Sequence, residues 1–274
     1  MEFFALASSA DELISQAHRI AGVGDIVDSE IEAPLRIFVR SLNTEAGLNE
    51  AGARGMEQRI LNVLCNRLRM LRDFRDHPEI AHEEIARPVF LTGAARTGST
   101  KLHKLLAASG DFKFNRFWHQ YSLATRSGRR SEDPSQRIMD AEAYVQLFDR
   151  LSPKAKLIHA LETFEPEEET VLFEHCMFAP YVMAFVSVPS FMQWYAAQDL
   201  RPQLEFIRRC LQYLQWQFYA DDARPWLLKC PVYCGMESVL ADVFPNAVFI
   251  VTPREPVGPN PSGAGLLAHY QVGY

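Results

Sequence analysis

The stretch RPVFLTGAARTGSTKLHKLLA, from Arg87 to Ala107, decides the fold class. A short apolar run ends in Gly93, which is typical of a buried strand. The residues after Gly98 carry the leucines of a helix that closes at Gly110. A glycine-containing turn between a strand and a helix offers backbone N–H groups to an anion. The stretch therefore predicts a phosphate-binding loop in an α/β domain.

The loop departs from the pattern of ATP-binding loops at one position. Gly93, Gly98 and Thr100 stand where G-x-x-x-x-G-K-[ST] requires them, but Ser99 occupies the lysine position. The later apolar run NAVFIVTPREP carries no acidic residue before its arginine, so the usual magnesium partner is also missing there. The loop therefore fits a phosphate diester or a phosphosulfate better than a triphosphate.

Other groups in the loop favour an anionic ligand. Arg96 supplies a planar guanidinium suited to phosphate or sulfate oxygens. Thr97, Ser99 and Thr100 add hydroxyl donors at the start of the helix. A ligand-free strand-to-helix turn is the alternative interpretation. His103, further along the helix, is expected on a helix face without a role in the site.

A second strand–helix–strand unit follows downstream as PWLLKCP, GMESVLADVFP and NAVFIVTPREP. Strands that alternate with helices predict a parallel sheet that binds ligands at its carboxyl ends. The predicted fold is thus α/β, a P-loop-like parallel sheet flanked by helices. Its expected domain spans residues 87–257, with a helical insertion at about 132–220 that contains DPSQRIMDAEAYVQLFDRL and PQLEFIRRCLQYLQWQFYA.

The first 86 residues are predicted to form a helical segment. In SADELISQAHRIAG, one helical face would carry Leu13, Ile14, Ala17, Ile20 and Ala21. A second helix repeats apolar residues at helical spacing, namely Met56, Ile60, Val63, Leu64, Leu68 and Leu71. Four arginines interleave with this stripe and are expected on a solvated face rather than against phosphate: Arg67, Arg69, Arg72 and Arg75. At the other end, residues 258–274 are rich in Gly and Pro and predict a mobile tail.

Composition bounds the class of protein. The 274 residues carry a net charge of −6 and are 48% hydrophobic, which favours a globular protein over a general nucleic-acid binder. No run of about 18 apolar residues predicts a membrane span, and the start MEFFALASSADEL does not resemble a signal peptide. The five cysteines are odd in number and widely spaced, so we expect reduced thiols in a cytoplasm and no metal site.

Several segments of the sequence resemble those of a known family. The loop is similar to the 5′-phosphosulfate loop of sulfotransferases that use 3′-phosphoadenosine 5′-phosphosulfate (PAPS), in the bacterial branch with P-R-T-G-[ST]-T. WLLKCPVYCGMESVLADVFPNAVFIVTPREP resembles the second block of that branch. LCNRLRM and IHALETFEPEEETVLF are also similar to it, so the resemblance covers about residues 10–257. The ordered set of blocks is more specific than any one of them.

The resemblance implies a role for each matching residue. The 5′-phosphosulfate would be cradled by Arg96, Thr97, Gly98, Ser99 and Thr100. Arg254 and Ser262 would bind the 3′-phosphate. Arg96 and Lys229 would stabilise the charge that builds on the leaving phosphate, and no metal would be required. A strand-end lysine in water is the alternative for Lys229.

The base that takes the proton of the acceptor is not determined by the resemblance. The branch usually has a histidine where this chain has Tyr233, and Trp-Glu where it has Trp118 and His119. His159, His119 and Glu168 are rival candidates, and the match around His159 favours that residue.

The expected function is sulfuryl transfer from PAPS to a hydroxyl or amine of a small-molecule or lipid-like acceptor. Two alternatives stay open. One is a P-loop kinase-like phosphotransferase, and the other is a catalytically weak or dead nucleotide-binding remnant, because the branch continues for roughly a hundred residues beyond TPREPV. Trp194, Tyr195 and Trp216 are expected to pack in the core rather than to line an acceptor pocket. The oligomeric state is left open.

Overall fold

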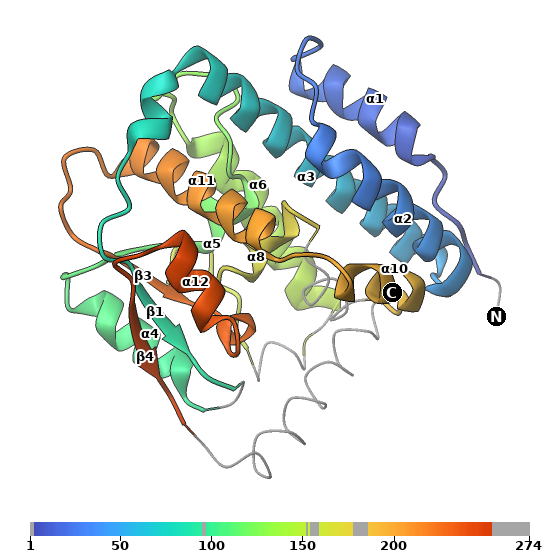
Figure 1. The fold of residues 1–274 in the computed structure, drawn as a ribbon. Coiled ribbons are helices and arrows are strands. Elements are labelled where there is room, and N and C mark those ends of the chain that lie inside the picture. Colours follow the sequence, from blue (N-terminus) through green and yellow to red (C-terminus); the bar gives the residue numbers. More distant parts are fainter. Residues whose placement is uncertain (1–2, 95–96, 152, 154–158, 178–185, 254–274) are drawn as a thin grey trace.

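The computed structural model describes residues 3–94, 97–151, 153, 159–177 and 186–253. Its centre is a parallel sheet of four strands in the order β2-β3-β1-β4 (Figure 1). The strands are β1 Val89–Thr92, β2 Lys113–Phe114, β3 Trp226–Lys229 and β4 Val248–Val251. The prediction of an α/β fold with a parallel sheet is confirmed. β2 was not predicted, because two residues carry no readable alternation.

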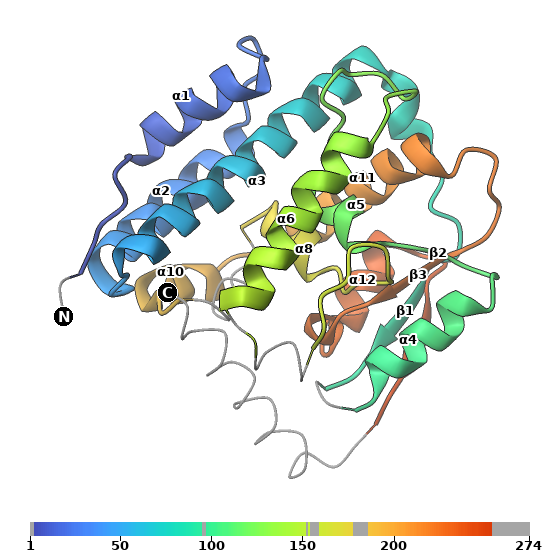
Figure 2. The same cartoon turned by 180° about the vertical axis from the view of Figure 1, so that it is seen from behind.

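Helices cover both faces of the sheet. Successive strand residues point to opposite sides, and in β1 and β3 the residues on both sides are apolar. On one face, Val89 and Leu227 pack with Ala107 of α4 (Ser99–Ala108). On the other face, Phe90 and Leu228 join the main core with α12 (Glu237–Val243) and α11 (Arg201–Phe218). Figure 2 shows α4 and α12 on opposite sides of the strands. The two central strands, β1 and β3, are buried at every residue, as expected for a sheet covered on two faces.

The helical segment at the N-terminal side forms the second layer of the molecule. It consists of α1 (Ala10–Ala21), α2 (Ser29–Glu45) and α3 (Glu50–Asp76), which lie beside α11 and α10 (Pro189–Ala196) in Figure 1. The insertion contributes α6 (Ser135–Leu151) and α8 (Thr170–Glu174). The remaining short helices are η1 (Pro78–His82), α5 (Phe117–Tyr121) and η2 (Pro231–Tyr233). The predicted helices at both ends of the insertion are therefore present.

Two expectations for this layer were wrong. Ile20 is 56% exposed, whereas Leu13 and Ala17 on the same helix are buried. Arg67 is 2% exposed, not solvated, because its guanidinium forms an ion pair with Asp28 and donates to the carbonyl oxygen of His175 at 2.8 Å. The spacing of residues along a helix predicts which side of the helix a side chain occupies. It does not predict whether a distant segment supplies a partner that allows a charged side chain to be buried there.

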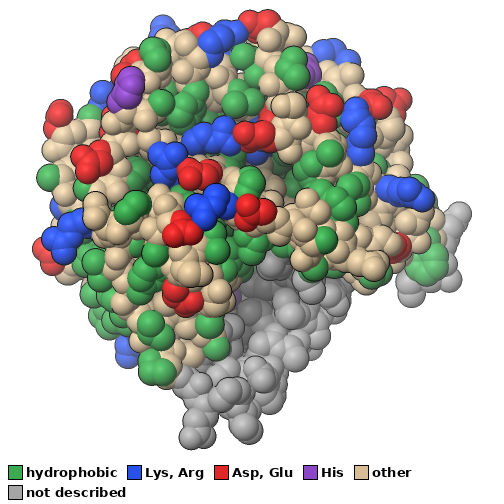
Figure 3. All heavy atoms as spheres, in the orientation of Figure 1, with side chains coloured by type: hydrophobic (Ala, Val, Ile, Leu, Met, Phe, Trp, Pro, Cys, Tyr) green, Lys and Arg blue, Asp and Glu red, His purple; other side chains and the backbone are tan. Residues whose placement is uncertain are grey.

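The expected core roles of the aromatic residues are confirmed. Trp216 is buried at 3% exposure, Tyr195 is buried, and Trp194 packs against the core and stacks near Phe191 at 5.7 Å. On the face shown in Figure 3, acidic and basic side chains are interspersed over the surface. No helix in the described part of the chain combines the length and apolar character that crossing a bilayer requires.

Candidate functional site

The predicted phosphate loop joins β1 to α4 and is shaped by a close approach of β4. Gly93 has φ 142°, and a Cβ placed there would lie 2.4 Å from Oγ1 and 2.7 Å from the carbonyl oxygen of Thr252. Thr252 follows β4, and its backbone N donates to the carbonyl oxygen of Thr92 at 2.9 Å. Only glycine fits between the two strand ends, so the first residue of the loop is fixed by the sheet.

The second loop glycine begins the helix. Gly98 is the N-cap residue of α4 with φ 86°, in the left-handed region that favours glycine. Because glycine has no side chain to cap the helix, the N–H groups of its first turn are left for another acceptor. Thr97 Oγ1 lies 2.8 Å from Thr252 Oγ1, Ser99 is buried, and Thr100 is exposed.

Three predicted ligand residues cannot be placed on this frame. Arg96, Arg254 and Ser262 lie outside the described residues. The roles that the resemblance implies for them stay predictions.

Lys229 lies beside the loop, at the carboxyl end of β3. It pairs with Leu91 of β1 in the sheet register, so its backbone is adjacent to the strand that leads into the loop. Its side chain is 2% exposed. Its Nζ donates to Thr100 Oγ1 at 3.1 Å and forms an ion pair with Glu168. The alternative of a lysine in water is therefore wrong, and a buried ammonium lies against the first turn of α4.

His159 and Glu167 form a second ion pair, next to the one between Glu168 and Lys229. His159 Nε2 lies 3.0 Å from Glu167 Oε1, and the backbone N of Glu168 donates to the same oxygen at 2.9 Å. Burial alone would lower the pKa of His159. The charge of Glu167 and its hydrogen bond, with a further contribution from Glu168, outweigh burial and raise the pKa to about 9. The imidazole is therefore protonated at neutral pH.

Two further histidines considered from the sequence, His119 and His103, are both buried. His119 is 1% exposed, its ring stacks on Phe218 with centroids 4.7 Å apart, and burial holds its pKa well below the usual range. His103 is on α4, one turn after Thr100, and is 2% exposed. Burial, then the charge of Lys229, lowers the pKa of His103 to about 4. Its Nε2 has no hydrogen-bond partner among the described groups. The sequence indicated a helix-face residue, and the face of α4 that carries His103 is buried and within electrostatic reach of Lys229.

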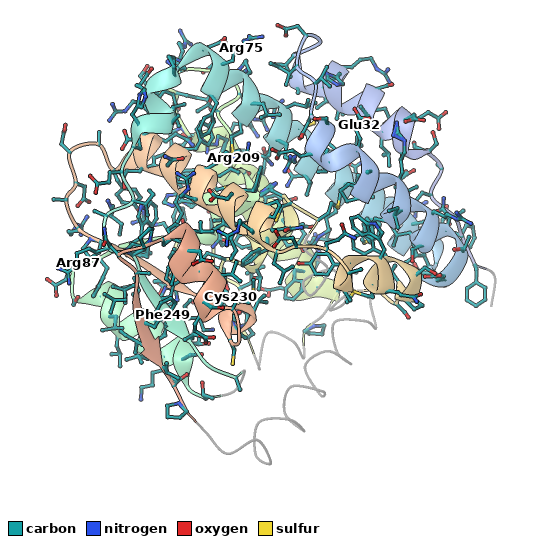
Figure 4. The ribbon with its side chains drawn as sticks, viewed as in Figure 1. Glu32, Arg75, Arg87, Arg209, Cys230 and Phe249 are labelled. Atoms are coloured by element: carbon teal, nitrogen blue, oxygen red, sulfur yellow. The ribbon has the colours of Figure 1, made fainter. Side chains whose placement is uncertain are left out.

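Glu169 is a site residue that sequence reasoning missed. It is fully buried, and its Oε2 accepts from the backbone N of Lys229 at 2.7 Å and from Tyr233 OH at 3.2 Å. Its Oε1 accepts from Asn115 Nδ2 at 3.1 Å. Figure 4 shows the neighbouring Cys230 beside α12, where β3 ends and the chain turns into η2. The signal in the sequence was the run of three glutamates after Pro166, which resembles an ordinary solvated charge run.

These elements together define an α/β protein with a glycine-containing loop between β1 and α4 and a buried cation at the carboxyl edge of its parallel sheet. Residues 88–260, more than half of the chain, match the model of the sulfotransferase family. The chain therefore belongs to the sulfotransferase family.

Solved structures agree with this assignment. Sulfotransferase STF1 from Mycobacterium tuberculosis H37Rv is 26% identical with a TM-score of 0.76, and the match covers 97% of this chain and 73% of that one. Sulfotransferase STF9 from Mycobacterium avium has the same fold, with a TM-score of 0.80 at 21% identity over 98% of this chain and 68% of that one. No curated protein matches the chain.

Proposed function

We propose that this protein transfers a sulfuryl group from PAPS to a hydroxyl or amine of a small-molecule acceptor. The observation that carries the proposal is the placement of Lys229, whose buried Nζ lies 3.1 Å from Thr100 Oγ1 at the start of α4. A phosphate on the N–H groups of this turn would lie beside the ammonium. Family membership supports a sulfuryl donor, and Ser99 in the lysine position disfavours a triphosphate.

The proposed reaction moves the sulfur between two oxygens, or from an oxygen to a nitrogen. The bond from sulfur to the bridging phosphate oxygen breaks while the acceptor atom forms a bond to sulfur and loses its proton. Negative charge builds on the leaving phosphate, which departs as adenosine 3′,5′-bisphosphate. Lys229 meets this charge inside a site of low exposure, where a fixed cation is most effective. Arg96 would contribute through the resemblance, with Thr97, Gly98, Ser99 and Thr100 around the 5′-phosphosulfate.

Glu168 is the residue that we propose as the base. Its carboxylate forms an ion pair with the Lys229 ammonium, so it lies next to the group that would stabilise the leaving phosphate. Its side chain is 15% exposed and is therefore more accessible to an acceptor than Lys229. His159, which the sequence favoured, has a pKa of about 9 and already carries a proton at neutral pH. His119 is stacked inside the core. Glu168 would take the acceptor proton as the new bond to sulfur forms.

The first test is a calorimetric titration with adenosine 3′,5′-bisphosphate and with ATP, each with and without Mg²⁺. We expect tighter binding of the bisphosphate, without dependence on Mg²⁺. Turnover is then measured with sulfur-labelled PAPS over a panel of hydroxyl and amine acceptors. Tighter binding of Mg-ATP would contradict the proposal and favour a kinase-like activity. Bisphosphate binding without any turnover would favour the remnant alternative.

A variant pair then tests the role of the lysine. Lys229→Met should lower kcat by about 10²- to 10³-fold, the range for removal of one charge-stabilising group. Lys113→Met is the matched control, because Lys113 is also a buried lysine of the sheet. It instead donates to Gln215 Oε1 at 2.7 Å and to the carbonyl oxygen of Asp222 at 3.0 Å. Equal losses in the two variants would show that Lys229 contributes only to packing.

A further inference from the structure

The three hydrogen bonds to Glu169 connect the ends of two strands and the short helix η2. Asn115 follows β2, Lys229 ends β3, and Tyr233 closes η2. Asn115, Tyr233 and Glu169 itself each have an exposed fraction of 0%. Burial raises the pKa of Glu169 to about 8, although the hydrogen bonds from Asn115, the backbone N of Lys229 and Tyr233 oppose this shift. In its ionised form the carboxylate only accepts hydrogen bonds, and all three neighbours present a donor to it. The cluster is thus a buried junction in which one side chain satisfies the polar groups of three segments.

The junction ends at the residue that matters most for the proposed chemistry. Glu169 holds the backbone N of Lys229 at 2.7 Å, while the preceding Glu168 forms an ion pair with Nζ of the same lysine. Adjacent glutamates therefore contact the two ends of one residue. With its backbone fixed by Glu169 and its head group by Glu168, Lys229 reaches Thr100 Oγ1 at 3.1 Å.

We propose that Glu169 is a positioning residue that aims Lys229 at the phosphate loop, and that Tyr233 completes this function by holding Glu169. The inference rests on the proposed function, since it assigns a task to Lys229. Glu169 does not contact the reacting atoms in this arrangement, because all its oxygens bind the protein interior. Its effect on catalysis passes through the direction of the lysine side chain.

Tyr233 is well placed for this task. Its ring packs edge-on against Phe90 at 5.1 Å and against Phe173 at 5.8 Å, so β1 and α8 fix its orientation. Its hydroxyl donates to Glu169 Oε2 at 3.2 Å. Burial raises the pKa of the Tyr233 hydroxyl, and the charge of Glu169 raises it further, so the group keeps its proton. Tyr233 is therefore a constant donor and not a proton acceptor.

Replacing Glu169 by glutamine should disturb the lysine while keeping the volume. The amide of glutamine carries two N–H donors of its own. Whichever way the amide is turned, its NH₂ group faces either Asn115 Nδ2 or the donors from Lys229 and Tyr233. At least one donor of the junction then loses its acceptor, and the end of β3 is held less firmly in place. A misplacement of about 1 Å can cost about 10²-fold in rate.

The matched control is Glu174→Gln. Glu174 is also a buried glutamate on α8, but its carboxylate is paired with Arg59 and not with Lys229. Glu174→Gln therefore also replaces a buried carboxyl group by an amide, but it leaves the contacts at the end of β3 intact. Tyr233→Phe is the milder test variant, because it removes one donor and keeps the ring.

The experiment measures two quantities on each folded variant, at a pH above the pKa of about 8 to which burial raises Glu169, so that the wild-type side chain is ionised. The first is the extent of reductive methylation of Lys229, determined by mass spectrometry, which reports whether the buried amine has become accessible. The second is the change in kcat, which is compared with the change in the dissociation constant of adenosine 3′,5′-bisphosphate. We expect Lys229 to be protected in the wild-type protein and in Glu174→Gln, and methylated in Glu169→Gln. We expect kcat to fall about 10- to 100-fold in Glu169→Gln and about threefold to tenfold in Tyr233→Phe, with nucleotide affinity within about threefold.

The outcomes separate this inference from the proposed function. A wild-type protein without turnover refutes the proposed function, and the methylation result then decides the positioning role alone. Full protection of Lys229 in folded Glu169→Gln overturns the positioning role, as does equal methylation or equal loss of kcat in Glu174→Gln. If Glu169→Gln does not fold, the same two measurements on Tyr233→Phe test the positioning role. Full protection of Lys229 together with an unchanged kcat in Tyr233→Phe would overturn it.

Discussion

Gly93→Ala is the substitution that most directly tests how the loop is built. The added Cβ would lie 2.4 Å from Thr252 Oγ1 and 2.7 Å from the Thr252 carbonyl oxygen, both shorter than any normal contact. The second of these atoms belongs to the backbone after β4, so it cannot move away as a flexible side chain would. We expect β4 to shift away from β1 and the hydrogen bond from Thr252 N to the Thr92 carbonyl oxygen to weaken.

The magnitude follows from two contributions. An alanine forced to positive φ costs about 1–2 kcal/mol, and φ at Gly93 is 142°. Overpacking that moves a backbone costs about 1–3 kcal/mol more. Gly93→Ala should therefore lower the free energy of unfolding by about 2–5 kcal/mol.

Gly98→Ala is the matched control for the steric contribution. Gly98 also has positive φ, at 86°, but nothing lies within 4 Å of its added Cβ. Only the conformational cost of about 1–2 kcal/mol applies there. The free energies of unfolding are measured by urea denaturation of both variants. If Gly93→Ala costs no more than Gly98→Ala, the close approach of β4 does not constrain the loop and the reasoning is refuted.

Two further predictions concern buried charges. Arg67→Met should lower the free energy of unfolding by about 3–5 kcal/mol, because the buried carboxylate of Asp28 loses its partner. Arg75→Met, at an exposed ion pair, should leave the free energy of unfolding nearly unchanged in the same denaturant titration, and equal effects would contradict the assignment of Arg67. The raised pKa of His159 implies stability that is fully present below the unfolded pKa of about 6.5 and lost as pH rises through about 9. His159→Gln should remove that part of the pH dependence of unfolding, and an unchanged profile would show that the ion pair with Glu167 is not formed in solution.

The parts of the fold that could be predicted from the sequence are those determined by local patterns. β1, β3 and β4 are short apolar runs bounded by Gly, Pro or polar residues, and each falls where the pattern indicated. The long helices α3 and α11 were equally visible through their apolar stripes. Such patterns depend on neighbours within one or two turns, so they need no knowledge of the tertiary structure.

The partners of buried charged residues could not be predicted in this way. Arg67 has the spacing of a surface arginine, and Asp28 lies 39 residues away on another part of the chain. Lys229 could be singled out from the sequence, but its ion pair with Glu168 spans 61 residues and its contact with Thr100 spans 129. An ionic group is buried only where a partner offsets its desolvation. That condition is set by the packing of helices and strands and leaves no local trace.

The run of glutamates after Pro166 shows how far composition can mislead at such a place. In the sequence, three adjacent carboxylates indicate a solvated surface, because like charges repel and none is expected inside. In the structure, each one has a different partner: Glu167 pairs with His159, Glu168 with Lys229, and Glu169 with the donors behind β3. The repulsion between neighbours is offset because Glu167 and Glu168 each face a cation, while burial raises the pKa of Glu169 to about 8 and so suppresses its charge at neutral pH. The three glutamates therefore do not act as one charged surface. Each side chain makes its own contact, with a partner that only the tertiary structure brings to it.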